Sequence, residues 1–312
     1  MPELPEVEAL AHHLREHALY RPVARVDVAS MSAVKTYRPP MSALRGRVVT
    51  GAARYGKFLA VEFVDRSDEP LHLITHLSRA GWLRWHDTAA TTPPKPGKGP
   101  LELRVHLDEV GGPGFDLTEA GTKRSLAAYL VTDPKTVLGV ARLGPDALAA
   151  DRETFAARIR SRRRQLKGVL TDQEILAGIG NAYSDEILHA AKLSPFRMTS
   201  SITDDEVRTL HRASIATLTR YTQTLRDEVG DGFPDKVTAF RPEMAVHGKY
   251  GQPCPVCGTK VQRIVYADNE ANYCPTCQTE GRLLADRSLS RLLKDDWPRT
   301  LEELEERRRA KP

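Results

Sequence analysis

Long apolar runs are missing from this 312-residue sequence, and no stretch approaches the ~18 hydrophobic residues that a membrane-spanning helix needs. The first residues, MPELPEVE, are acidic and lack the apolar core of a secretory signal peptide. Internal repeats are absent as well. These absences predict a cytoplasmic protein with no membrane partner.

A strong excess of either charge is also lacking. The chain has 46 Lys and Arg against 41 Asp and Glu, which gives a net charge of +5 and a pI near 9.0. This mild excess permits an anionic partner without requiring one. Basic side chains concentrate in one stretch, at Arg158, Arg160, Arg162, Arg163, Arg164 and Lys167. Taken alone, the stretch fits a phosphate-facing surface and a solvated helix face equally well.

The length predicts two or three structural units. Apolar spacing indicates a helix over residues 5–16. Short β-like stretches follow, which predict an antiparallel sandwich or barrel; they span residues 23–28, 47–53, 58–64, 71–77, 101–107 and 126–131. Residues 91–100, TTPPKPGKGP, cannot hold a sheet ladder and predict a mobile loop.

The pattern changes to helices after residues 143–146. Four apolar residues share one helical stripe: Phe155, Ile159, Leu166 and Leu170. Two capping boxes are predicted, Thr171 with Glu174 and Thr203 with Glu206. The second opens a long helix that the Gly/Pro-rich residues 230–234 end.

All four cysteines lie in two C-x-x-C pairs, sixteen residues apart: Cys254, Cys257, Cys274 and Cys277. Two such pairs supply a closed tetrahedral site of four sulfurs, which suits one structural Zn²⁺ and leaves no open position for catalysis. Two disulfides are the alternative, but the expected cytoplasm is reducing. A zinc module alone names no function.

A turn between two helical segments, residues 177–186, contains Gly178-Ile179-Gly180-Asn181. Its glycines permit a sharp reversal, and Asn181 could cap the next helix. A helix N-terminus is a natural phosphate site, although an ordinary helical hairpin has the same pattern.

Three separated segments together resemble the formamidopyrimidine-DNA glycosylase/endonuclease VIII family. They are the start PELPEVE, the turn GIGNAYSDE and the four-cysteine module. Residues 54–58, the junction 143–146 and Lys167 resemble further family features, so the resemblance covers residues 1–290. It implies an α+β multidomain fold: an N-terminal β-sandwich with flanking helices, a helix-two-turn-helix domain and a C-terminal zinc finger. The implied boundaries are 1–132, 133–245 and 246–284, followed by a charged tail over 285–312.

The resemblance implies a bifunctional DNA glycosylase and abasic-site lyase of base excision repair. Removal of Met1 would free the Pro2 amine, and an α-amine with a pKa of about 8 is partly neutral and nucleophilic. Glu3 would shuttle protons at the sugar. Glu6 would either hold the proline amine or favour the helix dipole, and Lys57 would contact a phosphate and the damaged base.

The implied partner is double-stranded DNA with damaged bases or abasic sites, bound by a monomer associated with the nucleoid. The residues expected to contact phosphates or other parts of the DNA are Lys167, Asn181, Tyr183, Arg79, Lys123 and Arg124. Extrusion of the nucleotide is expected because C1′ is shielded within the stacked duplex.

Four departures from the family pattern affect base recognition. Arg79 stands where a void-filling methionine is expected, and the arginine–x–phenylalanine wedge is missing near residues 121–125. Asn269 replaces an arginine of the zinc module, and residues 225–240 lack a recognisable loop for covering 8-oxoguanine. Two alternatives therefore stand beside the main hypothesis: a catalytically silent lesion-binding paralogue, and an endonuclease VIII-like enzyme that prefers oxidised pyrimidines.

Overall fold

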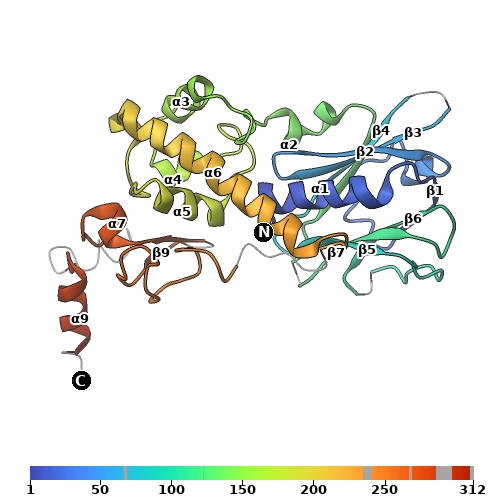
Figure 1. Cartoon of the computed structure of the whole chain (residues 1–312). Helices are drawn as coiled ribbons and strands as arrows, with labels where there is room; N and C mark the ends of the chain where they lie inside the picture. Colours follow the sequence, from blue (N-terminus) through green and yellow to red (C-terminus); the bar gives the residue numbers. More distant parts are fainter. Residues whose placement is uncertain are drawn as a thin grey trace. The chain divides into compact units, whose positions relative to one another are not determined.

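The structure is a computed structural model that describes residues 1–66, 69–97, 99–121, 123–234, 241–266, 269–285 and 297–309. The chain divides into two units (Figure 1). Unit 1 comprises Met1–Asp146 with Thr219–Ala239, and unit 2 comprises Ala147–Leu218 with Phe240–Pro312. No helix in the described ranges is long and apolar enough to cross a membrane.

Unit 1 is a β-sandwich with a helix against its core. Its antiparallel sheets have the strand orders β2-β3-β4-β8 and β1-β6-β7-β5. The strands are β1 (Val23–Val28), β2 (Val48–Tyr55), β3 (Phe58–Val64), β4 (Leu71–His76), β5 (Gly81–His86), β6 (Leu101–Leu107), β7 (Gly114–Glu119) and β8 (Ala127–Val131). The helix α1 (Leu4–Ala18) buries Val7, Leu10 and Leu14 in the same core as the inward-facing strand residues. This burial of apolar surface stabilises the sandwich.

The sandwich prediction is confirmed, but two of its strands were not predicted. β5 and β7 both begin with a glycine, and β7 contains Asp116, residue types that are depleted in strands. Tertiary pairing overrides this weak local preference, since β7 pairs with both β5 and β6. Residues 91–97 and 99–100 form no strand, as the prolines predict.

Short helical segments cover the outer face of the first sheet. The 3-10 turn η2 (Pro134–Thr136) leads into α2 (Leu138–Ala141), whose Val140 packs with Ile74. A Cβ at Gly139 would lie 2.6 Å from Cζ of Phe58. Only glycine therefore allows α2 to approach this ring. Another 3-10 turn, η1 (Met41–Leu44), follows β1 in the chain.

Unit 2 contains the helices α3 (Arg152–Arg160), α4 (Leu166–Leu170), α5 (Asn181–Ala190) and most of α6 (Asp204–Val229), with a 3-10 turn η3 (Thr199–Ser201). The predicted stripe of Phe155, Ile159, Leu166 and Leu170 is buried, but it is divided between α3 and α4.

Of the two predicted capping boxes, one is confirmed. The Thr203 N–H donates to Glu206 Oε2 at 2.7 Å, and the Glu206 N–H donates to Thr203 Oγ1 at 3.2 Å. Thr171 instead ends α4, where its hydroxyl donates to the Lys167 carbonyl, so the first predicted box is wrong. The long helix ends before Gly230, which has a positive φ of 55°.

The cysteine segment adds a small module to unit 2. It comprises the hairpin β9 (Gln262–Val265) and β10 (Glu270–Tyr273), followed by α7 (Pro275–Thr279). The helix α9 (Leu301–Arg309) lies in the predicted charged tail, and residues 286–296 of that tail lie outside the described residues.

Candidate active site and metal centre

The first turn of α1 buries the three N-terminal candidates. Pro2 is buried, Glu3 is 2% exposed and Glu6 is 0% exposed. The Glu3 N–H donates to Glu6 Oε2 at 2.8 Å, and the two residues form the capping box of the helix. Glu6 therefore lies in the first turn of the helix, where an acid is favourable, and its two predicted roles stay predictions.

Lys57 follows Gly56 in the tight turn between β2 and β3, and Gly56 has a positive φ of 54° that glycine adopts without strain. The Lys57 side chain is 6% exposed. Burial lowers the pKa of Lys57, while the charges of Glu3 and Glu6 act in the opposite direction. Lys57 is thus buried within reach of the charges of Glu3 and Glu6, and its contact with a phosphate and the damaged base stays a prediction.

His76 joins this group, although the sequence reasoning missed it. It pairs in register with Phe58, and the two ring centroids lie 4.8 Å apart. Burial and then the positive charge of Lys57 lower the pKa of His76. Its position opposite Phe58 would have marked His76 as a site residue only if the strand register were known, and the sequence does not give that register.

Three predicted DNA contacts, Arg79, Lys123 and Arg124, lie on two turns of unit 1 that touch each other. Arg79 is exposed and follows Ser78, whose hydroxyl contacts that of Ser125. Lys123 is exposed as well. Arg124 lies 3.2 Å from the buried carboxylate of Glu102, so this arginine is also tied to strand β6. Thr122 lies outside the described residues. So do residues 235–240, which form part of the segment predicted to lack the covering loop.

In unit 2, Lys167 bonds to the first turn of α5. Its Nζ donates to the Asn181 carbonyl and to Ser184 Oγ, both at 3.0 Å, and forms an ion pair with Asp185. Gly180 occupies the N-cap position, so the prediction that Asn181 caps the helix is wrong. Tyr183 is completely buried in this helix, and its predicted DNA contact stays a prediction.

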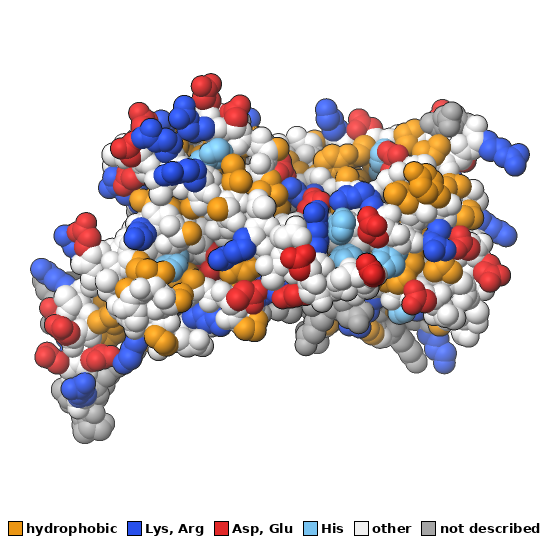
Figure 2. Space-filling view, in the orientation of Figure 1, with side chains coloured by type: hydrophobic (Ala, Val, Ile, Leu, Met, Phe, Trp, Pro, Cys, Tyr) orange, Lys and Arg blue, Asp and Glu red, His pale blue; other side chains and the backbone are white. Residues whose placement is uncertain are grey.

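The arginine cluster around α3 is largely paired with acids. Arg160 lies 2.6 Å from Asp204, and Arg164 lies 2.8 Å from Asp172. Arg162 lies 3.2 Å from Glu174. Basic and acidic side chains intermingle on this part of the surface (Figure 2). The pairing favours a solvated, ion-paired face over a purely phosphate-facing one.

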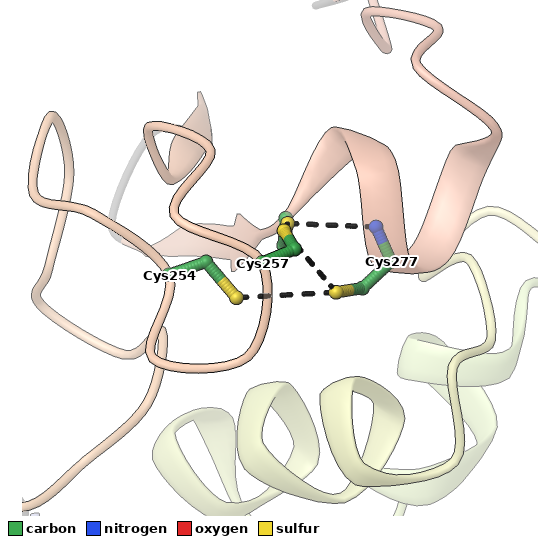
Figure 3. Close-up of side chains that lie close together, drawn as sticks. Cys254, Cys257 and Cys277 are labelled. Carbon is green, nitrogen blue, oxygen red and sulfur yellow. Dashed lines mark hydrogen bonds between the residues drawn. The ribbon is translucent and has the colours of Figure 1, made fainter.

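The four cysteines form a metal site. Their sulfurs all lie within 4.8 Å of one another, and the Cys254–Cys277 and Cys257–Cys274 pairs are 3.9 and 3.4 Å apart. Metal–sulfur bonds of about 2.3 Å in a tetrahedron require sulfur–sulfur distances of about 3.8 Å, so the donors fit Zn²⁺. Cys254, Cys257 and Cys277 converge from a loop and from α7 (Figure 3).

Models of known families match three consecutive parts of the chain: the formamidopyrimidine-DNA glycosylase N-terminal domain over residues 1–128, its H2TH domain over 143–228, and a zinc finger found in formamidopyrimidine-DNA glycosylase and isoleucyl-tRNA synthetase over 251–279. The formamidopyrimidine-DNA glycosylase of Thermus thermophilus is 35% identical over 296 residues, covering 90% of this chain and 100% of that protein. The chain belongs to the formamidopyrimidine-DNA glycosylase family.

Other members of the formamidopyrimidine-DNA glycosylase family extend the likeness. An uncharacterised glycosylase-like protein of Mycobacterium tuberculosis is 45% identical over 152 residues, which is 49% of this chain and 94% of that protein. The crystal structure of the Thermus thermophilus protein has a TM-score of 0.70 at 30% identity and covers 89% of this chain and 98% of its own. A Lactococcus lactis family member in complex with abasic-site DNA has a TM-score of 0.73 at 24% identity, and shares the fold. As a member of this family, the protein is a DNA glycosylase of DNA repair with one structural zinc.

Proposed function

We propose that this glycosylase is bifunctional: it removes oxidised bases from DNA and then cleaves the abasic strand through a Schiff base on Pro2. The observation that carries the proposal is the burial of Pro2 and Glu3 at the start of α1, together with a buried Lys57 on which the charge of Glu3 acts. A nucleophile, a proton-transferring carboxylate and a cation are the three groups that this chemistry needs. In this proposal residues 1–132 carry the chemistry, and residues 133–245 and 246–284 bind DNA.

The first step forms one bond and breaks another. After removal of Met1, the lone pair of the Pro2 nitrogen would attack C1′ of the damaged nucleotide, and the bond from C1′ to the base would break. The base would leave with a proton. The C1′–O4′ bond would then break, O4′ would take up a proton, and the nitrogen–C1′ bond would become an iminium. Glu3 would exchange protons with the sugar oxygen as the deoxyribose ring opens.

The iminium would then allow strand cleavage. Because it withdraws electrons from C1′, it acidifies C2′, and loss of a C2′ proton would expel the 3′ phosphate. A second elimination would expel the 5′ phosphate, and hydrolysis would restore the Pro2 amine. Lys57 supports these steps by placing a buried cation, balanced by Glu3 and Glu6, where a phosphate and the damaged base would bind.

The partner would be double-stranded DNA with a damaged base or an abasic site. The similar Lactococcus lactis structures are complexes with abasic-site DNA and with Fapy-dG-containing DNA, which supports this choice. Lys167 and Asn181 would contribute to phosphate binding through the first turn of α5, where backbone N–H groups and the helix dipole favour an anion.

Borohydride trapping tests the nucleophile. Incubation with an abasic-site duplex and borohydride should give a covalent complex whose crosslinked peptide begins at Pro2. Pro2→Gly should retain part of the reaction because it keeps an α-amine, whereas a form that retains Met1 should give none. Crosslinking to an internal lysine would refute the assignment.

A further inference from the structure

One face of α5 carries a group of buried polar side chains that contact the cysteine module. Asp185, Glu186 and His189 are 1%, 3% and 6% exposed, and each bonds to a residue between 245 and 272. Buried polar groups are costly unless they are paired, so these contacts fix the helix and the module in one arrangement.

Two carboxylates provide the backbone contacts. Glu186 accepts from three successive N–H groups, those of Ala245 at 2.8 Å, Val246 at 2.9 Å and His247 at 3.0 Å. Asp185 accepts from the Asn272 N–H at 3.1 Å and contacts Nδ1 of His247 at 2.8 Å. Hydrogen bonds to charged acceptors are the stronger ones, so α5 serves as the support on which the module is built.

The third contact reaches a metal ligand directly. Nε2 of His189 lies 3.3 Å from Sγ of Cys254, and Cys254 is itself 2% exposed. A metal-bound cysteine is a thiolate and carries no proton. The imidazole must therefore be the donor in the zinc-loaded protein, with the proton on Nε2.

We propose that His189 is a positioning residue of the zinc centre, which donates a hydrogen bond to the Cys254 thiolate and thereby couples zinc retention to the order of α5. The hydrogen bond stabilises negative charge on a sulfur that is buried away from water. It also holds that sulfur in place for the metal, as partners of metal ligands generally do. The metal also fixes this sulfur beside the imidazole, so loss of the metal weakens one of the contacts that hold α5.

Zinc release from the full-length protein tests the first part. His189→Leu should release zinc to a chromophoric chelator about 10-fold faster or more, the range typical for partners of metal ligands. His211→Leu is the matched control, since His211 is a unit 2 histidine that bonds to the Ala150 carbonyl instead of a thiolate. Equal release from wild type and His189→Leu would overturn the proposal.

A spectroscopic measurement separates a hydrogen bond from simple packing. In Co²⁺-substituted protein, the thiolate-to-metal charge-transfer band should move to lower energy in His189→Leu, because the sulfur loses a donor. The band should stay in place in His211→Leu. An unchanged band in His189→Leu would mean that the imidazole only fills space, and would refute the assignment.

Wild-type protein provides a measurement that does not depend on a folded variant. In ¹¹³Cd-loaded, ¹⁵N-labelled protein, His189 should be protonated at Nε2, and this proton should show a scalar coupling to cadmium through the sulfur. Amide exchange of α5 should also accelerate when zinc is removed, more than that of α3. A deprotonated Nε2 would contradict the proposal, and so would amide exchange of α5 at the same rate with and without zinc.

Discussion

The carboxylate of Glu8 lies 3.0 Å from Nε of Arg54. The same carboxylate pairs with Arg15 at 3.3 Å and with Arg226 at 3.1 Å, so it joins α1, β2 and the last part of α6 within unit 1. Arg54 is 8% exposed, and it is also paired with Asp146. One carboxylate thus compensates the positive charges of three arginines close to the start of α1.

Replacing this carboxylate should destabilise unit 1. Glu8→Gln leaves Arg54, Arg15 and Arg226 with less compensation, and we expect a loss of about 1–3 kcal/mol of unfolding free energy because partly buried charges lose their partner. Urea denaturation followed by tryptophan fluorescence measures this. Glu16→Gln, an exposed position on the same helix, should change stability by less than about 0.5 kcal/mol. Equal effects of the two substitutions would contradict the role of Glu8.

Zinc should be stoichiometric and necessary for DNA affinity. We expect one Zn²⁺ per chain, measured by atomic absorption, and loss of both the metal and DNA binding in Cys254→Ser, because three remaining thiolates no longer close the site. Binding of an abasic-site duplex, measured by fluorescence anisotropy, supplies the second readout. A metal-free wild-type preparation with full activity would disprove the assignment.

Acid should destabilise unit 1 through His13, which is 2% exposed. Burial, with smaller contributions from His12 and His17, lowers the pKa of His13 from 6.5 to about 4. The folded state binds this proton less readily than the unfolded chain. Its stabilising contribution is therefore complete above pH 6.5 and is lost as the pH falls from 6.5 towards 4, on the order of 3 kcal/mol in all. Unfolding free energies measured at pH 7 and pH 4.5 should differ less in His13→Leu than in wild type, and identical pH slopes would refute this cause.

Substrate range should follow the departures from the family pattern. In the proposed function, Pro2, Glu3 and Lys57 serve the chemistry, whereas the departures at Arg79, at residues 121–125 and at residues 225–240 weaken recognition of the base. Abasic sites, which need no base pocket, should therefore be cleaved fastest, followed by ring-opened purines or oxidised pyrimidines, which are easier to extrude. Loss of about 3 kcal/mol of base-specific contacts would slow excision of 8-oxoguanine roughly a hundredfold.

The comparison requires one enzyme preparation and single-turnover conditions. Duplexes that contain an abasic site, dihydrothymine, a formamidopyrimidine or 8-oxoguanine differ only at the lesion, so the abasic duplex is the internal control. Processing of 8-oxoguanine opposite cytosine as fast as the abasic site would show that the missing loop does not limit recognition.

Local patterns predict those parts of the molecule that neighbouring residues specify. The spacing of Cys254 and Cys257, and of Cys274 and Cys277, predicts the metal site because a C-x-x-C turn brings its own two sulfurs together. The Thr203 and Glu206 pair predicts a helix start for the same reason. β5 and β7 were not predicted because pairing with neighbouring strands stabilises them. The glycines at their starts weaken the local strand pattern that a sequence can show.

Contacts between distant residues limit what the sequence can reveal about the site. His76 reaches Lys57 only through the register of β3 and β4. Glu186 looks like part of a surface turn in the sequence, yet its partners lie about sixty positions further along. Asn181 has the right side chain for a cap, but the backbone places Gly180 there. A single sequence does not encode these outcomes in any local pattern.

The bonds between Glu186 and the cysteine module also limit when the second unit can fold during synthesis on the ribosome. Glu186 and the Ala245 N–H are 59 positions apart in the chain. At about 5–20 residues per second, the carboxylate waits roughly 3–12 s after its own synthesis before its first backbone partner is made. During that interval the carboxylate of Glu186 would have to stay hydrated, and α5 cannot adopt its final burial. Asp185 does not wait in this way, because Lys167 is already made. The second unit of the nascent chain is therefore the last to fold.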